Sequence, residues 1–448
     1  MKKIRYTLFV ALAALTLLLP VIFSTLDRRF STSGVETAQP FPEITGNALL
    51  NGEAQTKFEQ YVQQNLPGKP LMVRLRNQIT FSALHTTPNN NYSMNADKNL
   101  FTWGNVSYYM QYNEPVSEAY VRELVSKIER LQELAEQNGI QLFVFVTPCK
   151  IRYCEEELPW VDRVMAPQRG VGDYDRLVDA LEDSSLNYFD SIAYIDQHRA
   201  EFDPRVPLFY RTSVHWSVYV GNAVGAAFGE FLEEESGYNL PEVRVTARPC
   251  EEPVVPDADA FETFNLLQKP YDQYYEPVIE VTDASTDAPG MLCRGGSFMG
   301  QSLSAIVRHG YFGKDVYMEN DQIFTGNFGE RVIFHDYNEV DMGAYFKDID
   351  LLVLEVNEPS ISGMSFGFID YVLEHPQVLD QTEQRGEELW YFHLRYFYFC
   401  SFPRRWRCTR WRPCGGSGPE TRCCCFAPSV FTPTGACPIW DCFCCPFW

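Results

Sequence analysis

The sequence predicts a doubly wound, three-layer α/β/α fold with a mostly parallel sheet. Amphipathic helices alternate with short apolar strands along the chain, which is the pattern of this fold class. The run at 141–146, Gln-Leu-Phe-Val-Phe-Val, indicates a parallel strand that is buried on both faces. A length of 448 residues is enough for one large α/β domain with attachments, or for two domains.

The expected elements follow one another along the body of the chain. Residues 48–82 predict two helices joined near 67–68, and a short strand follows at 100–103. The helix at 116–138 has its apolar residues on one face, and Gly139 ends it. After the strand at 141–146 we expect a helix at 174–183, a strand at 188–195, a helix rich in small residues at 217–234, a strand at 290–293, a helix at 298–308, and strands at 316–318 and 351–355.

The N-terminus carries basic residues followed by an uncharged apolar run. Three of the first five residues are basic, and residues 6–26 as a helix would span about 30 Å, enough to cross a bilayer. We therefore expect an uncleaved signal anchor at 1–26, with the N-terminus in the cytoplasm and the body outside. A removable signal peptide and a buried soluble helix are the alternatives. Residues 27–45 predict a linker to the body.

The body is acidic. The chain has 37 Lys and Arg against 59 Asp and Glu, a formal charge of -22. Nucleic acid and anionic lipid head groups would be repelled by the folded body, so a neutral or diffusing substrate fits better. We expect a helical and β extension at 46–112 and the main domain at 113–380. Four cysteines precede residue 400 and either hold one disulfide or stay free: Cys149, Cys154, Cys250 and Cys293.

The C-terminal segment, 381–448, differs in composition from the rest of the chain. Residues 391–448 contain ten of the 14 cysteines, four of the eight tryptophans and only two acidic residues. The cysteines are crowded rather than spaced for a tetrahedral zinc site, and no strand or turn pattern accompanies them as in a disulfide-rich module. We interpret this segment as the product of translation in a wrong reading frame, and we expect it to be disordered or poorly defined.

Two short motifs far apart in the chain supply the groups that acyl transfer needs. His215 follows a polar loop in the motif Phe-Tyr-Arg-Thr-Ser-Val-His-Trp at 209–216, and its imidazole titrates near neutrality. Ser297 lies in Arg-Gly-Gly-Ser-Phe at 294–298, between an expected strand and an expected helix. The pair predicts a general base and a nucleophile. The plainer interpretation is a packing histidine and a serine that caps a helix.

The order of the two motifs resembles the SGNH-hydrolase-like family of alginate O-acetyltransferases, the AlgJ/AlgX type. In that family an Asp-x-His-Trp motif precedes a Gly-x-Ser-Phe or Gly-x-Ser-Tyr motif, and the resemblance runs over roughly residues 45–375. It implies an SGNH-hydrolase-like fold and an enzyme that passes an acetyl group from Ser297 to a polysaccharide hydroxyl outside the cytoplasm. It also implies a membrane-bound O-acyltransferase as the partner that supplies the acetyl group. Neither a cofactor nor a metal site is expected.

The chain departs from the family pattern at the acid. Ser213 stands where the family has the Asp that holds the imidazole, and in the serine-protease template replacing that acid by an amide lowers turnover by roughly 10⁴. Asp257 or Asp259 could orient the histidine instead, although each could also cap a turn or helix. Weaker candidates follow the last predicted strand, at Glu355 and Glu358.

The remaining site predictions concern the oxyanion and the substrate. Gly295 and Gly296 are expected to allow the sharp turn and to expose amides to an oxyanion, with Gly296 where many relatives carry Asp or Thr. Three residues are candidates for substrate binding: Trp216, Lys150 and Arg211. Lys150 could equally form a structural ion pair. The leading hypothesis is thus an extracytoplasmic O-acetyltransferase, with a carbohydrate esterase and an inactive glycan-binding or scaffold protein as the alternatives.

Overall fold

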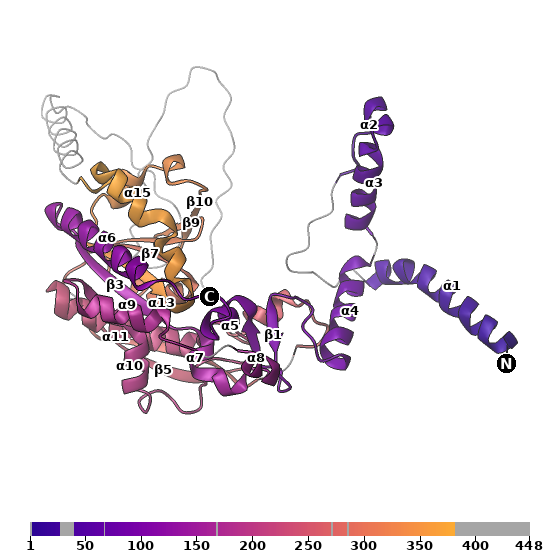
Figure 1. The fold of residues 1–448 in the computed structure, drawn as a ribbon, viewed down its shortest axis with the longest axis horizontal. Helices are drawn as coiled ribbons and strands as arrows, with labels where there is room; N and C mark the ends of the chain where they lie inside the picture. Colours follow the sequence, from indigo (N-terminus) through magenta and orange to yellow (C-terminus); the bar gives the residue numbers. More distant parts are fainter. Residues whose placement is uncertain are drawn as a thin grey trace, which may run out of the picture. The chain divides into compact units, whose positions relative to one another are not determined.

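A seven-stranded sheet forms the middle layer of the body (Figure 1). The computed structural model describes residues 2–26, 40–66, 68–166, 169–269, 272–284 and 286–380. The strand order is β10 (Glu330–Ile333), β9 (Gln322–Thr325), β8 (Lys314–Glu319), β7 (Gly290–Gly295), β11 (Leu351–Asn357), β3 (Gln141–Thr147) and β4 (Asn187–Asp190). The strands from β8 to β4 run parallel, and β9 and β10 add an antiparallel edge. The predicted mixed α/β fold with a large, mostly parallel sheet is confirmed.

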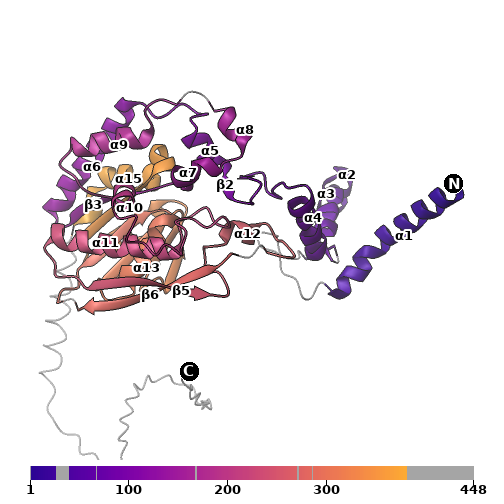
Figure 2. The ribbon, with the colours of Figure 1, turned by 90° about the horizontal axis from the view of Figure 1, so that it is seen from below.

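Helices cover both faces of this sheet, and Figure 2 shows the resulting layers. One face packs on α6 (Glu118–Gln137), α9 (Asp173–Glu182), α14 (Met342–Phe346) and α15 (Phe368–Glu374). The other packs on α10 (Ser191–Gln197), α11 (Val218–Ser236), α13 (Ser297–Val307) and the hairpin of β5 (Glu242–Cys250) and β6 (Tyr274–Asp283).

The central strands β3, β7 and β11 are apolar except near their ends, because each face of the sheet has its own core. In β3, Phe143 and Phe145 enter the core under α11, whereas Leu142, Val144 and Val146 enter the core under α6. Successive side chains of a strand point to opposite faces, so a strand covered on both sides has no polar position in its middle.

Helix α6 forms where its apolar periodicity predicts it. The Ser117 hydroxyl accepts a hydrogen bond from the Tyr120 amide at 3.1 Å and caps the first turn. The helix ends before Gly139, whose φ of +77° is a left-handed conformation that glycine adopts at low cost. The buried face consists of Val121, Leu124, Val125, Ile128, Leu131 and Ala135.

The strand expected at 188–195 is shorter than predicted. β4 ends at Asp190, and α10 begins at the next residue. The Asp190 carboxylate accepts hydrogen bonds from the amides of Ile192 and Ala193 at 2.9 and 3.2 Å. This N-cap starts a helix inside a stretch whose apolar residues fit a strand equally well.

The N-terminal part of the described chain is helical. The two helices expected over 48–82 are three: α2 (Gly46–Leu50), α3 (Glu53–Gln64) and α4 (Lys69–Ala83). The break between α2 and α3 falls at Gly52, where φ is +80°. Two short strands, β1 (Tyr92–Met94) and β2 (Leu100–Thr102), then pair before α5 (Trp103–Tyr109).

The predicted anchor coincides with α1 (Lys2–Leu26). Within the part of the chain that the structure describes, no helix is both long and apolar enough to cross a membrane. The anchor stays a prediction. Most of the predicted linker, 27–39, and the whole predicted tail, 381–448, lie outside the described residues.

Short elements follow the carboxyl ends of the strands and connect the layers. They are α7 (Lys150–Cys154), η2 (Glu155–Glu157), α8 (Trp160–Val164), α12 (Asp259–Thr263), η3 (Tyr337–Glu339), η4 (Glu358–Gly367) and η5 (Pro376–Leu379). The four cysteines of the body, all within the described residues, are free, so the structure contains no Cys149–Cys154 disulfide.

Candidate active site

Ser297 lies at the carboxyl edge of the sheet, where β7 passes into α13. Gly296 is the residue before the helix, and Ser297 is the first helical residue and is exposed. Gly295 is required for a reason other than the expected sharp turn. A Cβ at this position would lie 2.6 Å from Glu355 Oε2 and 2.9 Å from Glu355 Cβ, so only glycine lets β7 pass this side chain of β11.

His215 lies in a tight loop directly before α11. The Ser217 amide donates to the Leu208 carbonyl at 2.7 Å and closes the loop at its base. The Ser217 hydroxyl accepts from the Val220 amide and caps α11. The Ser213 hydroxyl accepts a hydrogen bond from the His215 amide at 3.0 Å. Ser213 therefore shapes the backbone of the loop, and its hydroxyl bonds the His215 amide instead of the imidazole.

Close packing of α11 on α13 brings the two motifs together. A Cβ on Gly225 of α11 would lie 2.1 Å from the Ser302 carbonyl oxygen of α13, so the two helix backbones are nearly in contact. His215 precedes one helix and Ser297 begins the other. The small residues of the first helix, noted in the sequence, thus determine how closely these two side chains approach.

The imidazole of His215 lies between a hydroxyl and a carboxylate. Nε2 of His215 is 2.7 Å from Ser297 Oγ, and Nδ1 is 2.8 Å from Asp259 Oδ2. A hydrogen bond from Nδ1–H to the carboxylate leaves Nε2 free to accept the serine proton. Asp259 is the first residue of α12, and its other carboxylate oxygen accepts from the Ala260 amide at 2.7 Å. The three side chains have the geometry of a Ser-His-Asp triad.

The two candidate acids have different positions. Asp257 is fully buried and accepts a hydrogen bond from the Val218 amide at 2.8 Å, which caps the first turn of α11. Burial raises the pKa of Asp257 to about 7, and the charge of nearby Asp259 adds to the effect. Of the two, Asp259 contacts the imidazole, and Asp257 supports the helix that follows the histidine loop.

Backbone amides at the start of α13 are available to an oxyanion. The amides of Ser297 and Phe298 have no acceptor among the described residues, as expected in the first turn of a helix. The Gly296 amide donates to the buried carboxylate of Glu355 and is therefore not a donor to the oxyanion, in contrast to the expectation from sequence. A carbonyl carbon above Ser297 Oγ would place its oxygen next to the two open amides.

Glu355 is the buried partner of this turn. Its carboxylate accepts from the Thr147 hydroxyl at 2.6 Å as well as from the Gly296 amide. Burial raises its pKa to about 7, against the opposing effect of these hydrogen bonds. Glu355 joins the ends of β3, β11 and β7, and it does not contact the imidazole as a weak candidate acid would.

Part of the chain matches a known protein family. Residues 100–312 match the family model of the SGNH hydrolase-like domain, acetyltransferase AlgX. This part of the chain is therefore similar to the SGNH hydrolase-like domain of that acetyltransferase family. His215, Asp259 and Ser297 all fall inside the matched range. No curated protein matches the chain.

Three solved structures are similar to the chain. The O-acetyltransferase domain of Pseudomonas putida AlgJ is 17% identical, with 65% of this chain and 99% of that chain covered and a TM-score of 0.40. Bacillus cereus PatB1 with a sulfonyl adduct is 11% identical, with 61% of this chain and 99% of that chain covered and a TM-score of 0.39. Pseudomonas aeruginosa AlgX is 14% identical, with 64% of this chain and 65% of that chain covered and a TM-score of 0.33.

The three residues expected to bind substrate have other contacts. Lys150 is buried, and its ammonium donates to the carbonyls of Leu100, Tyr210 and Ser213 at 2.7–2.8 Å. All three of its N–H groups are used, so it fixes the histidine loop to the end of β3 and has none left for a sugar. Burial lowers its pKa to about 8.

Trp216 and Arg211 also belong to the scaffold of the loop. The Trp216 ring is fully buried and packs edge-on against Phe298, with 5.3 Å between ring centroids. It therefore supports the histidine loop from inside the core. The Arg211 guanidinium is 2.7 Å from the Asp272 carboxylate and donates to the Asp97 carbonyl at 3.3 Å.

Sequence reasoning missed Glu319, at the end of β8. Glu319 pairs in register with Gly295, two residues before Ser297. Burial raises its pKa, and the nearby charges of His215 and Arg294 oppose this effect. The available signal was its position directly after the predicted strand at 316–318, because the carboxyl ends of parallel strands share one edge.

Proposed function

We propose that the protein is an extracytoplasmic O-acetyltransferase that modifies a polysaccharide through an acetyl-serine intermediate. The observation that carries the proposal is the hydrogen-bonded series from Ser297 through His215 to Asp259. The acetyltransferase family match over residues 100–312 supports acyl transfer as the chemistry. Ser213 stands where the family has an acid, but Asp259 supplies a carboxylate to Nδ1 of His215 from a different segment of the chain.

The geometry supports two half-reactions. In the first, Nε2 of His215 takes the Ser297 proton as Oγ attacks the acetyl carbonyl, and the donor's oxygen leaves with that proton. The amides of Ser297 and Phe298 stabilise the tetrahedral oxyanion. In the second, His215 removes a proton from a sugar hydroxyl, whose oxygen attacks the acetyl-serine, and the proton returns to Ser297 Oγ.

The setting of this chemistry is part of the proposal. Helix α1 would anchor the chain with its N-terminus in the cytoplasm, so that the triad faces a glycan outside the membrane. A membrane-bound O-acyltransferase would supply the acetyl group. These features follow from the apolar N-terminus and from the family resemblance.

A release assay with the full chain tests the proposal. We expect the protein to release p-nitrophenol from p-nitrophenyl acetate, and Ser297→Ala to lower the rate at least about 10³-fold, because the nucleophile is lost. Ser304→Ala is the matched control in the same helix, since among the described residues its hydroxyl bonds only to the Gln301 carbonyl and Asn222. Equal rates for Ser297→Ala and the unmodified protein would remove Ser297 from the mechanism.

The same assay separates transfer from hydrolysis. With an oligosaccharide acceptor present, mass spectrometry should find a product heavier by one acetyl group, together with an acetylated Ser297 peptide in quenched samples. Free acetate as the sole product across a panel of acceptors would make the protein an esterase with the same triad.

A further inference from the structure

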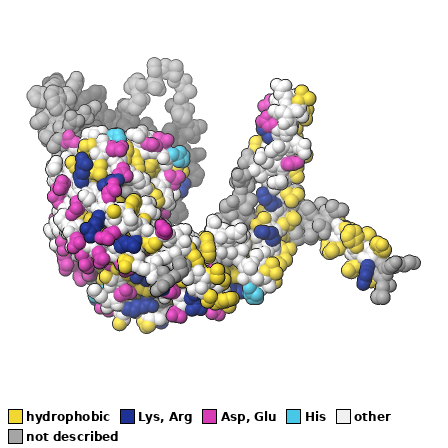
Figure 3. All heavy atoms as spheres, viewed as in Figure 1, with side chains coloured by type: hydrophobic (Ala, Val, Ile, Leu, Met, Phe, Trp, Pro, Cys, Tyr) yellow, Lys and Arg dark blue, Asp and Glu magenta, His cyan; other side chains and the backbone are white. Residues whose placement is uncertain are grey.

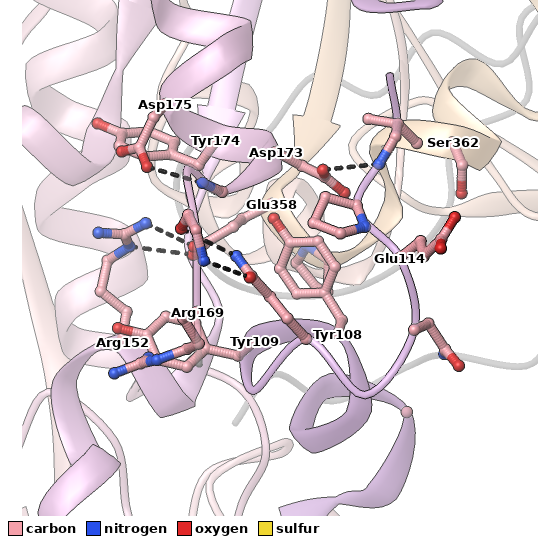
Figure 4. A pocket seen from close by; sticks show the side chains of 18 residues that line it. Tyr108, Tyr109, Glu114, Arg152, Arg169, Asp173, Tyr174, Asp175, Glu358 and Ser362 are labelled. Carbon is pink, nitrogen blue, oxygen red and sulfur yellow. Dashed lines mark hydrogen bonds and ion pairs between the residues drawn. The ribbon is translucent and has the colours of Figure 1, made fainter. Parts of the chain in front are cut away.

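A cavity lies on the same edge of the sheet as Ser297. This cavity of about 600 Å³ opens where β3 and β11 end, and Figure 4 shows the side chains around it. β11 lies next to β7, and β3 lies next to β11. At about 4.8 Å between neighbouring strands, the end of β3 is roughly 10 Å from the end of β7. The carboxyl edge of a parallel sheet is where α/β folds bind ligands.

A buried ion pair forms the floor of this cavity. Glu358 is 1% exposed and accepts from Nε and Nη2 of Arg152 at 3.1 and 2.6 Å. Its carboxylate also accepts from the Cys149 amide at 3.1 Å. The Arg152 guanidinium lies over the Tyr174 ring, 4.3 Å from its centroid. These contacts hold the floor rigid, because each charged group has several partners.

The Tyr108 hydroxyl is available within the cavity. Tyr108 is partly buried, and its ring lies among the side chains that line the cavity in Figure 4. Its hydroxyl has no hydrogen-bond partner among the described residues. Burial and the nearby charges of Glu358 and Asp173 raise its pKa, so it remains a neutral O–H that can donate and accept. A ligand with hydroxyl groups would satisfy it.

The outer wall of the cavity is held in place by side-chain contacts. The Gln111 amide bonds the Gly170 backbone in both directions, at 2.8 and 3.2 Å. Arg169 forms an ion pair with Glu155 at 2.6 Å and lies over the Tyr109 ring. A cavity with a fixed wall and floor loses little entropy when it binds a ligand.

The charge of the cavity identifies the class of ligand. Four acids line it, namely Glu114, Asp173, Asp175 and Glu358, against two arginines. Both guanidiniums already pair with carboxylates, Arg152 with Glu358 and Arg169 with Glu155. The chain as a whole carries -22, and acidic side chains are spread over the face of the body seen in Figure 3. A uronate or phosphate group would be repelled, whereas neutral hydroxyls would find both donors and acceptors.

We infer that this cavity binds a neutral saccharide unit of the glycan that the triad acetylates. That the ligand belongs to the acetylated glycan rests on the proposed function. That the ligand is neutral rests on the charges that line the cavity alone. A volume of about 600 Å³ lies within the usual range of small-ligand pockets. The site would hold the polymer beside Ser297 and select against acidic chains.

Calorimetric titration of the full chain tests the inference. The probes are neutral hexasaccharides of glucose, mannose and N-acetylglucosamine, compared with hexagalacturonate of the same length. We expect at least one neutral probe to bind at least tenfold more tightly than hexagalacturonate. Tyr108→Phe should weaken that binding about fivefold, the effect of one lost hydrogen bond, while p-nitrophenyl acetate release stays unchanged.

Two further variants keep the outcomes distinct. Tyr219→Phe is the matched control, because Tyr219 does not line the cavity and its hydroxyl accepts from the Asp203 amide at 3.0 Å. This variant should bind the neutral probe as tightly as the unmodified protein does. Ser297→Ala should bind the neutral probe normally, so a failure of the triad mechanism leaves the cavity result intact. Unchanged affinity in Tyr108→Phe, equal affinity for hexagalacturonate, or no binding of any neutral probe at millimolar concentration would overturn the inference.

Discussion

Replacing Asp259 by Asn tests the central assignment of the site. The change keeps the size of the side chain and removes the charge that faces His215 Nδ1 at 2.8 Å. An ion pair with charge centres about 4 Å apart is worth about 1 kcal/mol in water and about 4 kcal/mol near a protein surface. The His215 and Asp259 side chains are 15% and 25% exposed, which places this pair between the two limits. We therefore expect a loss of about 10²- to 10³-fold in kcat, less than the roughly 10⁴-fold of a fully buried triad.

The assay is p-nitrophenyl acetate release by the full chain, with kcat and KM measured separately. KM should change little, because Asp259 acts through the histidine and not on the ester. Asp257→Asn is the control two residues away, since its carboxylate bonds the Val218 amide. Ser213→Ala is the control at the family's acid position. A rate for Asp259→Asn within threefold of the unmodified protein, or a larger loss in Ser213→Ala, would refute the assignment.

Two further predictions concern the scaffold. Gly225→Ala places a Cβ 2.1 Å from the Ser302 carbonyl oxygen and should destabilise the body by about 1–3 kcal/mol, with lower activity because α11 and α13 separate. Gly104→Ala, whose Cβ would have nothing within 4 Å, is the control and should leave the melting temperature unchanged. Equal melting temperatures for the two variants would contradict the packing argument. Burial raises the pKa of Glu355 to about 7, so the folded protein retains a proton that the unfolded chain releases above about pH 4.5. Stability should therefore fall as pH rises from about 4.5 to about 7, and Glu355→Gln should remove up to about 1.4 kcal/mol per pH unit of this slope. Urea unfolding at pH 5 and pH 8 measures this dependence of stability on pH, and an unchanged slope in Glu355→Gln would contradict the prediction. Burial also raises the pKa of Asp257 to about 7, and this residue contributes to the slope with the same sign in both proteins.

The sequence predicted the central strands β3, β7 and β11 well because they are buried on both faces, whereas the antiparallel edge strands β9 and β10 were not predicted. The apolar run at 141–146 became the buried strand β3, and the helix expected at 116–138 is α6 within two residues at each end. The strand at 188–195 was overextended because the Asp190 cap was not recognised. Local apolar pattern thus identified the elements, and side-chain capping decided where one of them ended.

The site was predicted less completely than the fold. Ser297 and His215 were named from their motifs, and the structure brings them to 2.7 Å. Asp259 was one of two candidate acids that the sequence could not rank, because both lie in the same short segment. Lys150 and Trp216 were candidates for substrate binding, with a structural ion pair as the alternative for Lys150. The structure buries both side chains, and they support the histidine loop. A motif identifies a reactive residue type, but it does not state which neighbours face solvent.

Sequence alone determined the alternation of strands and helices, the acidic charge, and the two motifs with a serine and a histidine. These properties are local, since they follow from the periodicity and chemistry of neighbouring residues. Tertiary structure decided that Asp259 rather than Ser213 holds the imidazole and that Gly295 makes room for Glu355. It also placed the Tyr108 hydroxyl, which has no partner among the described residues, in a cavity at the carboxyl edge of the sheet. Each of these depends on segments separated by at least 40 residues, whose approach is set by the packing of α11 on α13 and by the order of strands in the sheet.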